Sequence, residues 1–354
     1  MKATFTKLEL HFKRPVGTSR GIMNIKNSWI LKLTKDEITG VGEISIIEGL
    51  SPDFENSESF EKKIQEVCEE LEHGAWNMEH GLSSLNTFPS IKFGVETALR
   101  DLQNGGKGII FDNDFTHGKR QLAINGLIWM GDEAFMNEQI EQKLEEGFST
   151  LKMKIGAIDF ETELKLLHSI RKRYSKNEIT LRVDANGSFM PHQAKSVLEQ
   201  LAELDIHSIE QPIQAGKWEE MKNLCANSPT PIALDEELIG IEDVSKKIEL
   251  LETIRPQYII LKPSLHGGIS GTQEWIQLAE ERTIPWWMTS ALESNIGLNA
   301  ICQLAGEYNN KLPQGLGTGS LYTNNVESDL VVENGLILKK KSEFEIRNSE
   351  FGIL

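Results

Sequence analysis

The stretch that decides the fold is TLKMKIG at residues 150–156, and four runs of the same kind follow it. They are ITLRVDANG at 179–187, SIEQP at 208–212, PIALDEE at 231–237 and YIILKPS at 258–264. Each run is a short apolar segment that ends in polar or Gly/Pro residues, and a segment with helical spacing of its apolar residues lies in each gap. This alternation is typical of parallel strands joined by helices.

Three further runs bring the number of expected strands to about eight. They are AINGLIWM at 123–130, PWWMTS at 285–290 and PQGLGTG at 313–319. Eight strand–helix units are the number that closes a (β/α)8-type barrel. The sequence therefore predicts an α/β fold with a barrel over residues 120–325.

Five of these runs end in a charged residue: Lys154, Asp184, Glu210, Asp235 and Lys262. Successive side chains of a strand face opposite ways, so the neighbours of these groups, such as Leu151 and Met153, would face the helices. Active sites of barrel folds lie at the carboxyl ends of the strands. We therefore expect all five charged groups to point into the mouth of the barrel.

The chain outside the barrel predicts a second, smaller unit. Residues 4–33 alternate like β-strands, and residues 60–102 carry apolar side chains at helical spacing. Strands followed by helices predict an α+β capping domain over residues 1–119. The tail returns to strand-like alternation, so segment 326–354 is expected to pack back on this first domain.

Composition excludes several classes of partner. The formal net charge is −16, which repels nucleic acid and anionic membrane surfaces. The three cysteines are odd in number and widely scattered, so they predict neither a disulfide framework nor a zinc site. The amino terminus has no apolar core like that of a signal peptide, and no segment has the apolar length of a membrane helix. We expect a cytoplasmic protein whose partner is a small molecule.

Three carboxylates brought together at strand ends would raise one another's pKa unless a cation offsets their charge. Oxygen ligands without His or Cys favour magnesium, with manganese as a substitute, over zinc. Asp184, Glu210 and Asp235 are therefore the predicted metal ligands. Any one of them alone could equally be a helix cap or the partner of a lysine.

Lysines facing a metal indicate proton transfer at carbon. A lysine base must lose its proton, and because its ordinary pKa is about 10.4, working near pH 7 requires about 4 to 5 kcal/mol. Lys152 shares a face with Lys154 and would depress the pKa of its neighbour by charge repulsion. The negative charge of the resulting enediolate would fall on oxygens that the metal binds. By itself, a Lys-x-Lys strand is more typical of a solvated edge.

The five positions resemble the motifs of the enolase superfamily, in its muconate-lactonising-type branch. They are Lys152-Met153-Lys154, Asp184-Ala185-Asn186, Glu210-Gln211-Pro212, Asp235-Glu236 and Lys262-Pro263. Singly these strings are weak, but their order and spacing cover nearly the whole chain. The superfamily uses a lysine or histidine base with magnesium, so the resemblance implies the same here.

Within that branch, the chain is similar to a family of dehydratases of menaquinone biosynthesis. The stretches that carry this likeness are GTSRG at 17–21, LKPSLHGGISG at 261–271, SALESNIGL at 290–298 and GLGTGSLY at 315–322. The resemblance implies that Lys154 takes the α-proton of a hydroxylated cyclohexadiene carboxylate and then helps the hydroxyl to leave, which forms an aromatic ring. It also implies that Lys262 is a cation over that ring and that Lys152 assists at the substrate carboxylate.

Further residues are expected around this centre. Asn186 and Glu236 would orient the inner groups, although Asn186 is also a typical turn residue before a glycine. Ser290 and the helix start after it would bind a second substrate carboxylate, with Glu293 as a supporting or helix-start acid. Thr18 and Arg20 stand on a loop that could close over the pocket. The tryptophans of the PWWMTS run are expected to be barrel packing rather than ligand platforms.

Other functions remain open from the sequence. Racemisation of N-acylamino acids needs the same two lysines, and a muconate cycloisomerase would use the same frame. A dipeptide epimerase would carry an acidic DxD motif near the last barrel strand, where this chain has GTGSLYTNN at 317–325. A barrel that binds metal without catalysis is a further alternative, but all five charged positions are filled.

Overall fold

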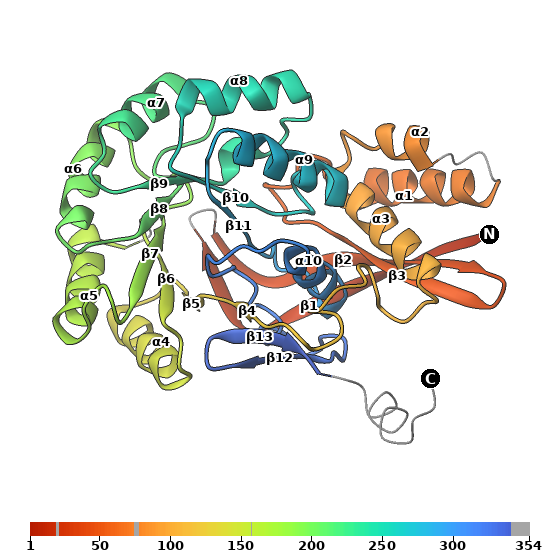
Figure 1. The fold of residues 1–354 in the computed structure, drawn as a ribbon, viewed down its shortest axis with the longest axis horizontal. Coiled ribbons are helices and arrows are strands. Elements are labelled where there is room, and N and C mark those ends of the chain that lie inside the picture. Colours follow the sequence, from red (N-terminus) through yellow and green to blue (C-terminus); the bar gives the residue numbers. More distant parts are fainter. Residues whose placement is uncertain (19–20, 74–77, 157, 341–354) are drawn as a thin grey trace.

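The computed structural model describes residues 1–18, 21–73, 78–156 and 158–340, and Figure 1 shows two parts packed side by side. The first part begins with an antiparallel sheet in the order β1-β2-β3. Its strands are β1 (Lys2–Thr18), β2 (Gly21–Lys35) and β3 (Ile38–Ser45). The helices that follow are α1 (Ser57–Glu72), α2 (Met78–Ser83) and α3 (Pro89–Gln103). The predicted α+β domain is therefore present.

The sheet of this domain is held by its alternating pattern. Trp29, Leu31 and Leu33 of β2 all face inward and are buried against the helices, as the period of two predicts. Strand β3 lies directly on α3 because glycines stand at the crossing: a Cβ atom on Gly42 would come within 2.0 Å of the carbonyl oxygen of Gly94. A side chain at either glycine would push the helix off the sheet.

The second part contains a parallel seven-stranded sheet in the order β11-β10-β9-β8-β7-β6-β5. Its strands are β5 (Gly126–Ile128), β6 (Thr150–Lys154), β7 (Thr180–Asp184), β8 (Ser208–Glu210), β9 (Ile232–Leu234), β10 (Tyr258–Leu261) and β11 (Trp286–Met288). The helices are α4 (Glu133–Glu145), α5 (Phe160–Arg173), α6 (Pro191–Ala202), α7 (Trp218–Asn227), α8 (Val244–Ile254), α9 (Gly268–Glu281) and α10 (Asn295–Gly306), with a 3-10 turn η1 (Glu236–Leu238). The predicted barrel architecture is confirmed.

The eighth expected run, PQGLGTG, closes the barrel without forming a strand. Gln314 makes an isolated bridge with Ile124, and Gly315 makes one with Thr289. The backbones come so close that a Cβ atom on Gly315 would lie 2.2 Å from the hydroxyl of Thr289. Glycine therefore permits closure here, but the run is too irregular to continue the ladder.

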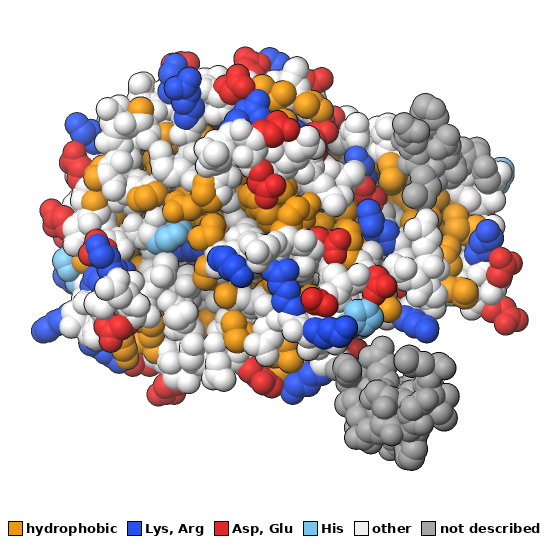
Figure 2. All heavy atoms as spheres, viewed as in Figure 1, with side chains coloured by type: hydrophobic (Ala, Val, Ile, Leu, Met, Phe, Trp, Pro, Cys, Tyr) orange, Lys and Arg blue, Asp and Glu red, His pale blue; other side chains and the backbone are white. Residues whose placement is uncertain are grey.

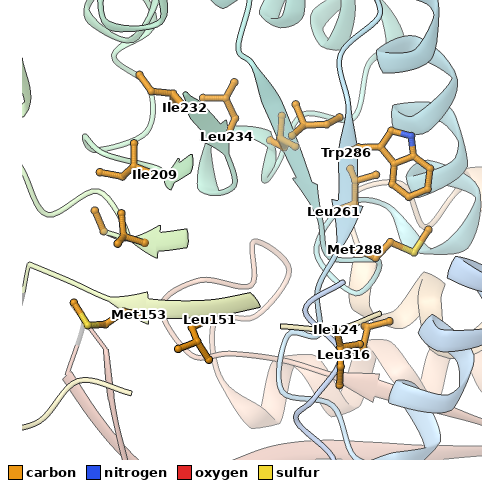
Figure 3. Close-up of a cluster of buried hydrophobic side chains, with 14 of the residues drawn as sticks. Ile124, Leu151, Met153, Ile209, Ile232, Leu234, Leu261, Trp286, Met288 and Leu316 are labelled. Carbon is orange, nitrogen blue, oxygen red and sulfur yellow. The ribbon is translucent and has the colours of Figure 1, made fainter. Parts of the chain in front are cut away.

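The core of the barrel lies between its strands and its helices. Leu151 and Met153 of β6 and Ile209 of β8 point outward from the sheet into this layer (Figure 3). The opposite faces of the same strands carry the charged groups, so the expected division of each strand into two faces is confirmed. On the side visible in Figure 2, acidic and basic side chains are interspersed over the surface.

The end of the chain differs from the expectation. Strands β12 (Leu330–Glu333) and β13 (Leu336–Lys339) form a hairpin whose second strand pairs with β4 (Leu122–Ala123), not with the sheet of the first domain. Contacts with the first domain come from Tyr322, which bridges Phe12 of β1, and from Lys339 of β13, whose Nζ lies 3.4 Å from the carbonyl oxygen of Gly108. Alternation identifies a strand but not its partner, so the pairing with β4 was not expected, and residues 341–354 of the expected segment lie outside the described residues. We keep 1–119 and 120–325 as proposed domain limits, with this hairpin on the barrel side.

Among the helices in the described part of the chain, none combines the length and the apolar character that a membrane crossing requires.

Candidate active site

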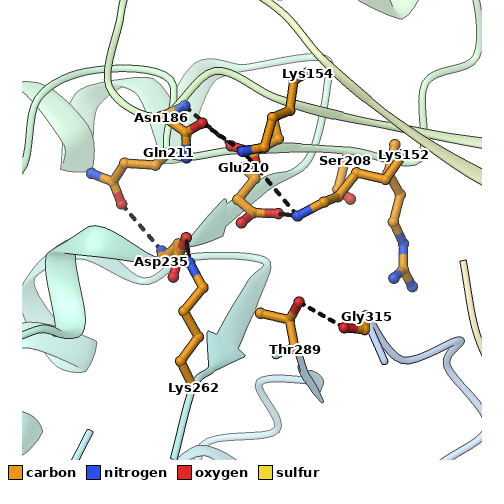
Figure 4. Close-up of polar contacts among 12 residues, drawn as sticks. Lys152, Lys154, Asn186, Ser208, Glu210, Gln211, Asp235, Lys262, Thr289 and Gly315 are labelled. Carbon is orange, nitrogen blue, oxygen red and sulfur yellow. Dashed lines mark hydrogen bonds and ion pairs between the residues drawn. The ribbon is translucent and has the colours of Figure 1, made fainter. Parts of the chain in front are cut away.

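The ends of five consecutive strands bring the predicted charged residues together. Strand pairing places Lys154 of β6 opposite Asp184 of β7, and Asp184 opposite Glu210 of β8. Asp235 directly follows β9, and Lys262 directly follows β10. With Lys152, these residues form what we call the mouth cluster: Lys152, Lys154, Asp184, Glu210, Asp235 and Lys262. All six are buried, and Figure 4 shows Lys154 and Lys262 reaching the carboxylates from different sides.

Ion pairs connect the members of the mouth cluster. The ammonium nitrogen of Lys152 lies 3.1 Å from Asp184 Oδ2 and 2.8 Å from Glu210 Oε2. Lys154 Nζ lies 2.8 Å from the same Asp184 oxygen, and Lys262 pairs with Asp235 Oδ2. Each ammonium therefore stands against the carboxylates that were predicted to hold a cation.

Burial and these ion pairs shift the pKa values of the three carboxyl groups in different directions. Burial opposes ionisation of Asp184, but Lys154 and Lys152 outweigh it and hold the pKa of Asp184 well below its usual range. Burial, reinforced by the Asp184 carboxylate, raises the pKa of Glu210 to about 8. Burial likewise raises the pKa of Asp235. Three lysines thus do not fully offset the cost of burying three acids.

The same balance keeps the lysines charged. Burial alone would lower the pKa of Lys152, but the carboxylates of Glu210 and Asp184 hold it above its ordinary value. Burial would also lower the pKa of Lys262, and Asp235 raises it above the ordinary value in the same way. Lys152 and Lys262 would therefore lose their protons more easily only if another cation took over these carboxylates.

The oxygen atoms of the mouth cluster fit a hard divalent cation. Within the described ranges, Glu210 Oε1 and Asp235 Oδ1 are buried without a hydrogen-bond partner, which is costly for a carboxylate. The ligand set contains only oxygen, as magnesium prefers. In the part of the chain that the structure describes, no three Asp, Glu, His or Cys side chains stand ready to hold a metal. The ammonium groups lie between the acids, so metal binding would require Lys152 to withdraw.

Two polar side chains support this cluster. Asn186 accepts a hydrogen bond from Lys154 Nζ (2.7 Å) and donates one to Glu236 Oε1 (3.0 Å). Asn186 and Glu236 therefore lie beside the mouth cluster, and their supporting role stays a prediction. Asn186 also has φ +45°, a left-handed conformation that asparagine tolerates better than most residues.

Gln211 is a supporting residue that the sequence analysis named only as part of a motif. Its side-chain oxygen accepts hydrogen bonds from the backbone nitrogens of Asp235 and Glu237, at 3.2 Å each. Its nitrogen donates to Glu237 Oε2 at 2.9 Å. Gln211 therefore fixes the turn that carries Asp235, although its own φ of +40° is strained. The pairing spans two strands, so the sequence alone gave no signal for it.

A cavity of about 160 Å³ opens above the cluster and is lined by both domains. The barrel supplies Lys152, Lys154 and Lys262, and the first domain supplies apolar side chains such as Met23 and Ile47. Trp129, which the sequence analysis did not single out, forms another part of the wall. Its ring centroid lies 5.9 Å from Lys154 Nζ, a cation–π distance. A mixed apolar and cationic cavity suits a ring that carries carboxylates.

Of the residues expected to bind the rest of the substrate, some line the cavity and others do not. Ser290 lines the cavity, but its hydroxyl already donates to Glu293 Oε2 (2.7 Å) and accepts from Thr318 (2.9 Å). Glu293 is fully buried and does not line the cavity. The side chain of Thr18 and the whole of Arg20 lie outside the described residues.

The helix start after Ser290 already holds an anion. Backbone nitrogens of Ser294 and Gly297, in the first turn of α10, donate to the carboxylate of Glu43. A second substrate carboxylate therefore cannot take these donors without displacing Glu43, contrary to the expectation. The two tryptophans of β11, Trp286 and Trp287, are buried and do not line the cavity, as expected.

Comparison with known proteins agrees with this architecture. The family model described as "Enolase C-terminal domain-like" matches residues 136–341. The o-succinylbenzoate synthase of Desulfotalea psychrophila is 46% identical over a 365-residue alignment that covers 95% of this chain and 98% of the relative. The L-Ala-D/L-Glu epimerase of Bacillus subtilis is 30% identical over 49% of this chain and 47% of the relative.

A solved structure supports the same assignment. The crystal structure of MenC from Desulfotalea psychrophila LSv54 superimposes with a TM-score of 0.85 and 42% identity, covering 96% of this chain and 99% of that one. Members of the enolase superfamily use a divalent metal, typically magnesium. With the family model, a full-length relative and the shared fold in agreement, this chain belongs to the enolase superfamily.

Proposed function

We propose that this chain catalyses the o-succinylbenzoate synthase reaction in the cytoplasm, as a step of menaquinone biosynthesis. The substrate would be 2-succinyl-6-hydroxy-2,4-cyclohexadiene-1-carboxylate, which loses water to become aromatic. The observation that carries the proposal is Lys154 on a cavity of about 160 Å³, paired with Asp184, the first of three acids at adjacent strand ends. The full-length relative that bears this name supports the choice of reaction.

In this proposal Lys154 handles the proton. Its neutral amine would take the hydrogen from C1, leaving an enediolate on the carboxylate. The resulting ammonium would then return the proton to the hydroxyl on C6, which leaves as water while the C1–C6 double bond forms. Asn186 holds the ammonium nitrogen at 2.7 Å, so the group that takes the proton is oriented before the reaction.

Asp184, Glu210 and Asp235 are the proposed ligands of Mg²⁺, with Mn²⁺ as a substitute. The bound metal would stabilise the negative charge that develops on the substrate carboxylate. The two buried carboxylate oxygens without partners, on Glu210 and Asp235, support this assignment. Gln211 and the hydrogen bond from Asn186 to Glu236 would keep the ligands in place.

The other two lysines would act by charge. Lys152 would contact the substrate carboxylate once the metal takes over Glu210 and Asp184. Lys262 stands across the cavity and would place its ammonium over the ring of the intermediate, where cation–π attraction favours it. Ser290 and its neighbours would form the wall for the succinyl part, and Thr18 and Arg20 remain proposed lid residues.

The experiment is an assay of the purified protein with Mg²⁺ and the cyclohexadiene substrate, followed by the ultraviolet change as the aromatic ring forms. We expect turnover by the native chain and none by Lys154→Ala. Absence of turnover in the native chain would reject the reaction, and full turnover by Lys154→Ala would reject the assigned base.

A second candidate, racemisation of an N-acylamino acid, is favoured by one observation. Lys154 and Lys262 line the same cavity, so two lysine side chains face one substrate, where one could take a proton as an amine and the other deliver one as an ammonium. Incubation of N-succinylamino acids in deuterated water would separate the candidates. Exchange of the α-hydrogen that exceeds dehydration in kcat/KM would favour the racemase.

A further inference from the structure

A second group of buried charges lies where the first domain meets the start of α10. We call it the interdomain cluster: Lys26 on β2, Glu43 on β3 and Glu293 just before α10. Burial lowers the pKa of Lys26, and the nearby Glu43 and Glu293 carboxylates oppose that effect. None of the three lines the cavity. The cluster therefore does not touch substrate, and its role must pass through other residues.

Glu43 accepts four hydrogen bonds, three of which come from the barrel and join the two domains. Its Oε1 accepts from Ser28 Oγ (2.7 Å) and from Ser294 N (2.9 Å). Its Oε2 accepts from Ser294 Oγ (2.5 Å) and from Gly297 N (2.9 Å). A carboxylate of the first domain thus occupies the amino terminus of a barrel helix, where both the free backbone N–H groups and the helix dipole favour it.

The segment that Glu43 fixes leads directly into the cavity wall at residues 290–292. Leu292 of that wall has φ +63°, a left-handed conformation that is unfavourable for leucine. Its backbone is fixed on both sides, because its nitrogen donates to Ser290 Oγ (2.9 Å) and its oxygen accepts from Tyr322 Oη (2.7 Å). Such a conformation persists only where the surroundings hold it.

Glu293 fixes the same wall from below. Its carboxylate accepts hydrogen bonds from Ser290 and from Ser264, the latter on the loop that follows Lys262. The wall is therefore held at Ser290 by Glu293, at Leu292 by Tyr322 and at Ser294 by Glu43. Only the last of these contacts comes from the first domain.

We propose that Glu43 is a positioning residue that fixes cavity wall 290–292 through the start of α10. Glu43 thereby contributes to substrate affinity without itself lining the cavity. The inference deepens the function proposed above and rests on it for its kinetic test.

The chain offers a matched control for this contact. Glu96 of α3 is also a buried carboxylate of the first domain at the start of a barrel helix, because it accepts from the backbone nitrogens of Ile269 and Ser270 in α9. Neither Ile269 nor Ser270 lines the substrate cavity. Glu96→Gln therefore removes the same kind of contact at a place where the proposal predicts no effect on affinity.

The experiment compares Glu43→Gln with Glu96→Gln in the full chain with Mg²⁺. In Glu43→Gln an amide N–H would face backbone N–H groups, so the helix start loses acceptors. In Glu43→Gln we expect KM to rise about tenfold while kcat stays within about threefold of native, which is the pattern of lost substrate binding. Glu96→Gln should keep the native KM. Amide hydrogen exchange in peptide 289–297 should accelerate about tenfold or more in Glu43→Gln only.

Two results would overturn the inference: unchanged exchange of peptide 289–297 in Glu43→Gln, or equal KM in the two variants. If the native chain does not turn over the substrate, the proposed function fails while the exchange experiment still decides the positioning role. If Glu43→Gln does not fold, Ser28→Ala removes one of the four hydrogen bonds from within the first domain. It should accelerate exchange of the same peptide less strongly, and no acceleration would equally overturn the inference.

Discussion

The mouth cluster and the interdomain cluster are both buried groups of lysines and acids, but they satisfy their charges differently. In the interdomain cluster, the Glu43 carboxylate accepts four hydrogen bonds. In the mouth cluster, one oxygen each of Glu210 and Asp235 has no partner among the described residues. A complete set of hydrogen bonds fixes a structure, whereas unsatisfied acceptors are typical of a place that receives a ligand.

The largest expected effect comes from removing the proposed base of the mouth cluster. Lys154→Met should lower kcat by at least about 10³-fold, since general acid–base groups contribute on the order of 10² to 10⁴ and here one group acts twice. Steady-state ultraviolet assays measure this loss. Lys176→Met is the control, because Lys176 pairs with Asp205 in an exposed ion pair and should leave kcat unchanged. A Lys154→Met enzyme within tenfold of native would contradict the assignment of the base.

The next largest effect is the change in the free energy of unfolding when Mg²⁺ is added, which should depend on the mouth cluster and not on the interdomain cluster. Mg²⁺ at about 100 times its dissociation constant should raise the free energy of unfolding of the native chain by about 2.7 kcal/mol. Glu210→Gln should lose most of this gain because it lacks one proposed ligand charge. Glu43→Gln should be less stable than native but keep the gain. Urea titrations with and without Mg²⁺ measure both values.

If Mg²⁺ raised the free energy of unfolding equally in Glu210→Gln and in the native protein, the metal would bind elsewhere. Loss of the gain in Glu43→Gln would show that the two clusters are not independent, since their members would then be coupled through the cavity wall.

The mouth cluster could be predicted from the sequence and the interdomain cluster could not. Lys154, Asp184 and Glu210 recur at equivalent strand ends, and strand geometry converts that recurrence into proximity. Glu43 and Ser294 are 251 residues apart, and nothing in the local pattern around either one indicates the other. Long-range pairing of this kind is a property of the packed domains.

The fold shows the same limit. Alternating apolar runs were enough to predict the barrel and the capping domain. They did not predict that the run at 313–319 would close the barrel by two bridges, or that β13 would pair with β4. The role of Gln211 in holding Asp235 was equally hidden, because it depends on two strands lying side by side.

Arg182, in the barrel interior, is a third buried charge, and no carboxylate of the described residues lies within hydrogen-bond distance of it. Its guanidinium lies 3.9 Å from the ring centroid of Trp287 and donates to the carbonyl of Pro313. Burial, with a further contribution from this guanidinium, lowers the pKa of His207 to about 4. His207 therefore stays neutral in the folded chain at pH values where it is protonated in the unfolded chain.

That difference predicts a loss of stability in acid. Above pH 7 His207 is neutral in both the folded and the unfolded chain. As pH falls from about 6.5 to about 4, the unfolded chain binds a proton that the folded chain does not, so the free energy of unfolding falls. At pH 5 the loss should be about 2 kcal/mol. His207→Gln should show a smaller decline between pH 8 and pH 5 by that amount in urea unfolding. Equal declines in the two proteins would mean that His207 is protonated in the folded state.

The smallest effect concerns the strained wall that joins the two clusters. Leu292→Ala and Leu292→Gly both remove a buried side chain, so both should be less stable than native. Glycine accepts φ +63° without penalty, whereas alanine does not. Leu292→Gly should therefore exceed Leu292→Ala in free energy of unfolding by about 1 kcal/mol.

Leu298 provides the reference for this comparison because it is equally buried but lies within α10, where the backbone is helical. There the order should reverse, with Leu298→Gly about 1 kcal/mol less stable than Leu298→Ala. Urea unfolding of the four variants gives both differences under the same conditions. The same order at both positions would mean that Leu292 carries no backbone strain. Side-chain packing would then hold the wall, and the hydrogen bond from Tyr322 to the Leu292 carbonyl would not be needed to maintain an unfavourable backbone conformation.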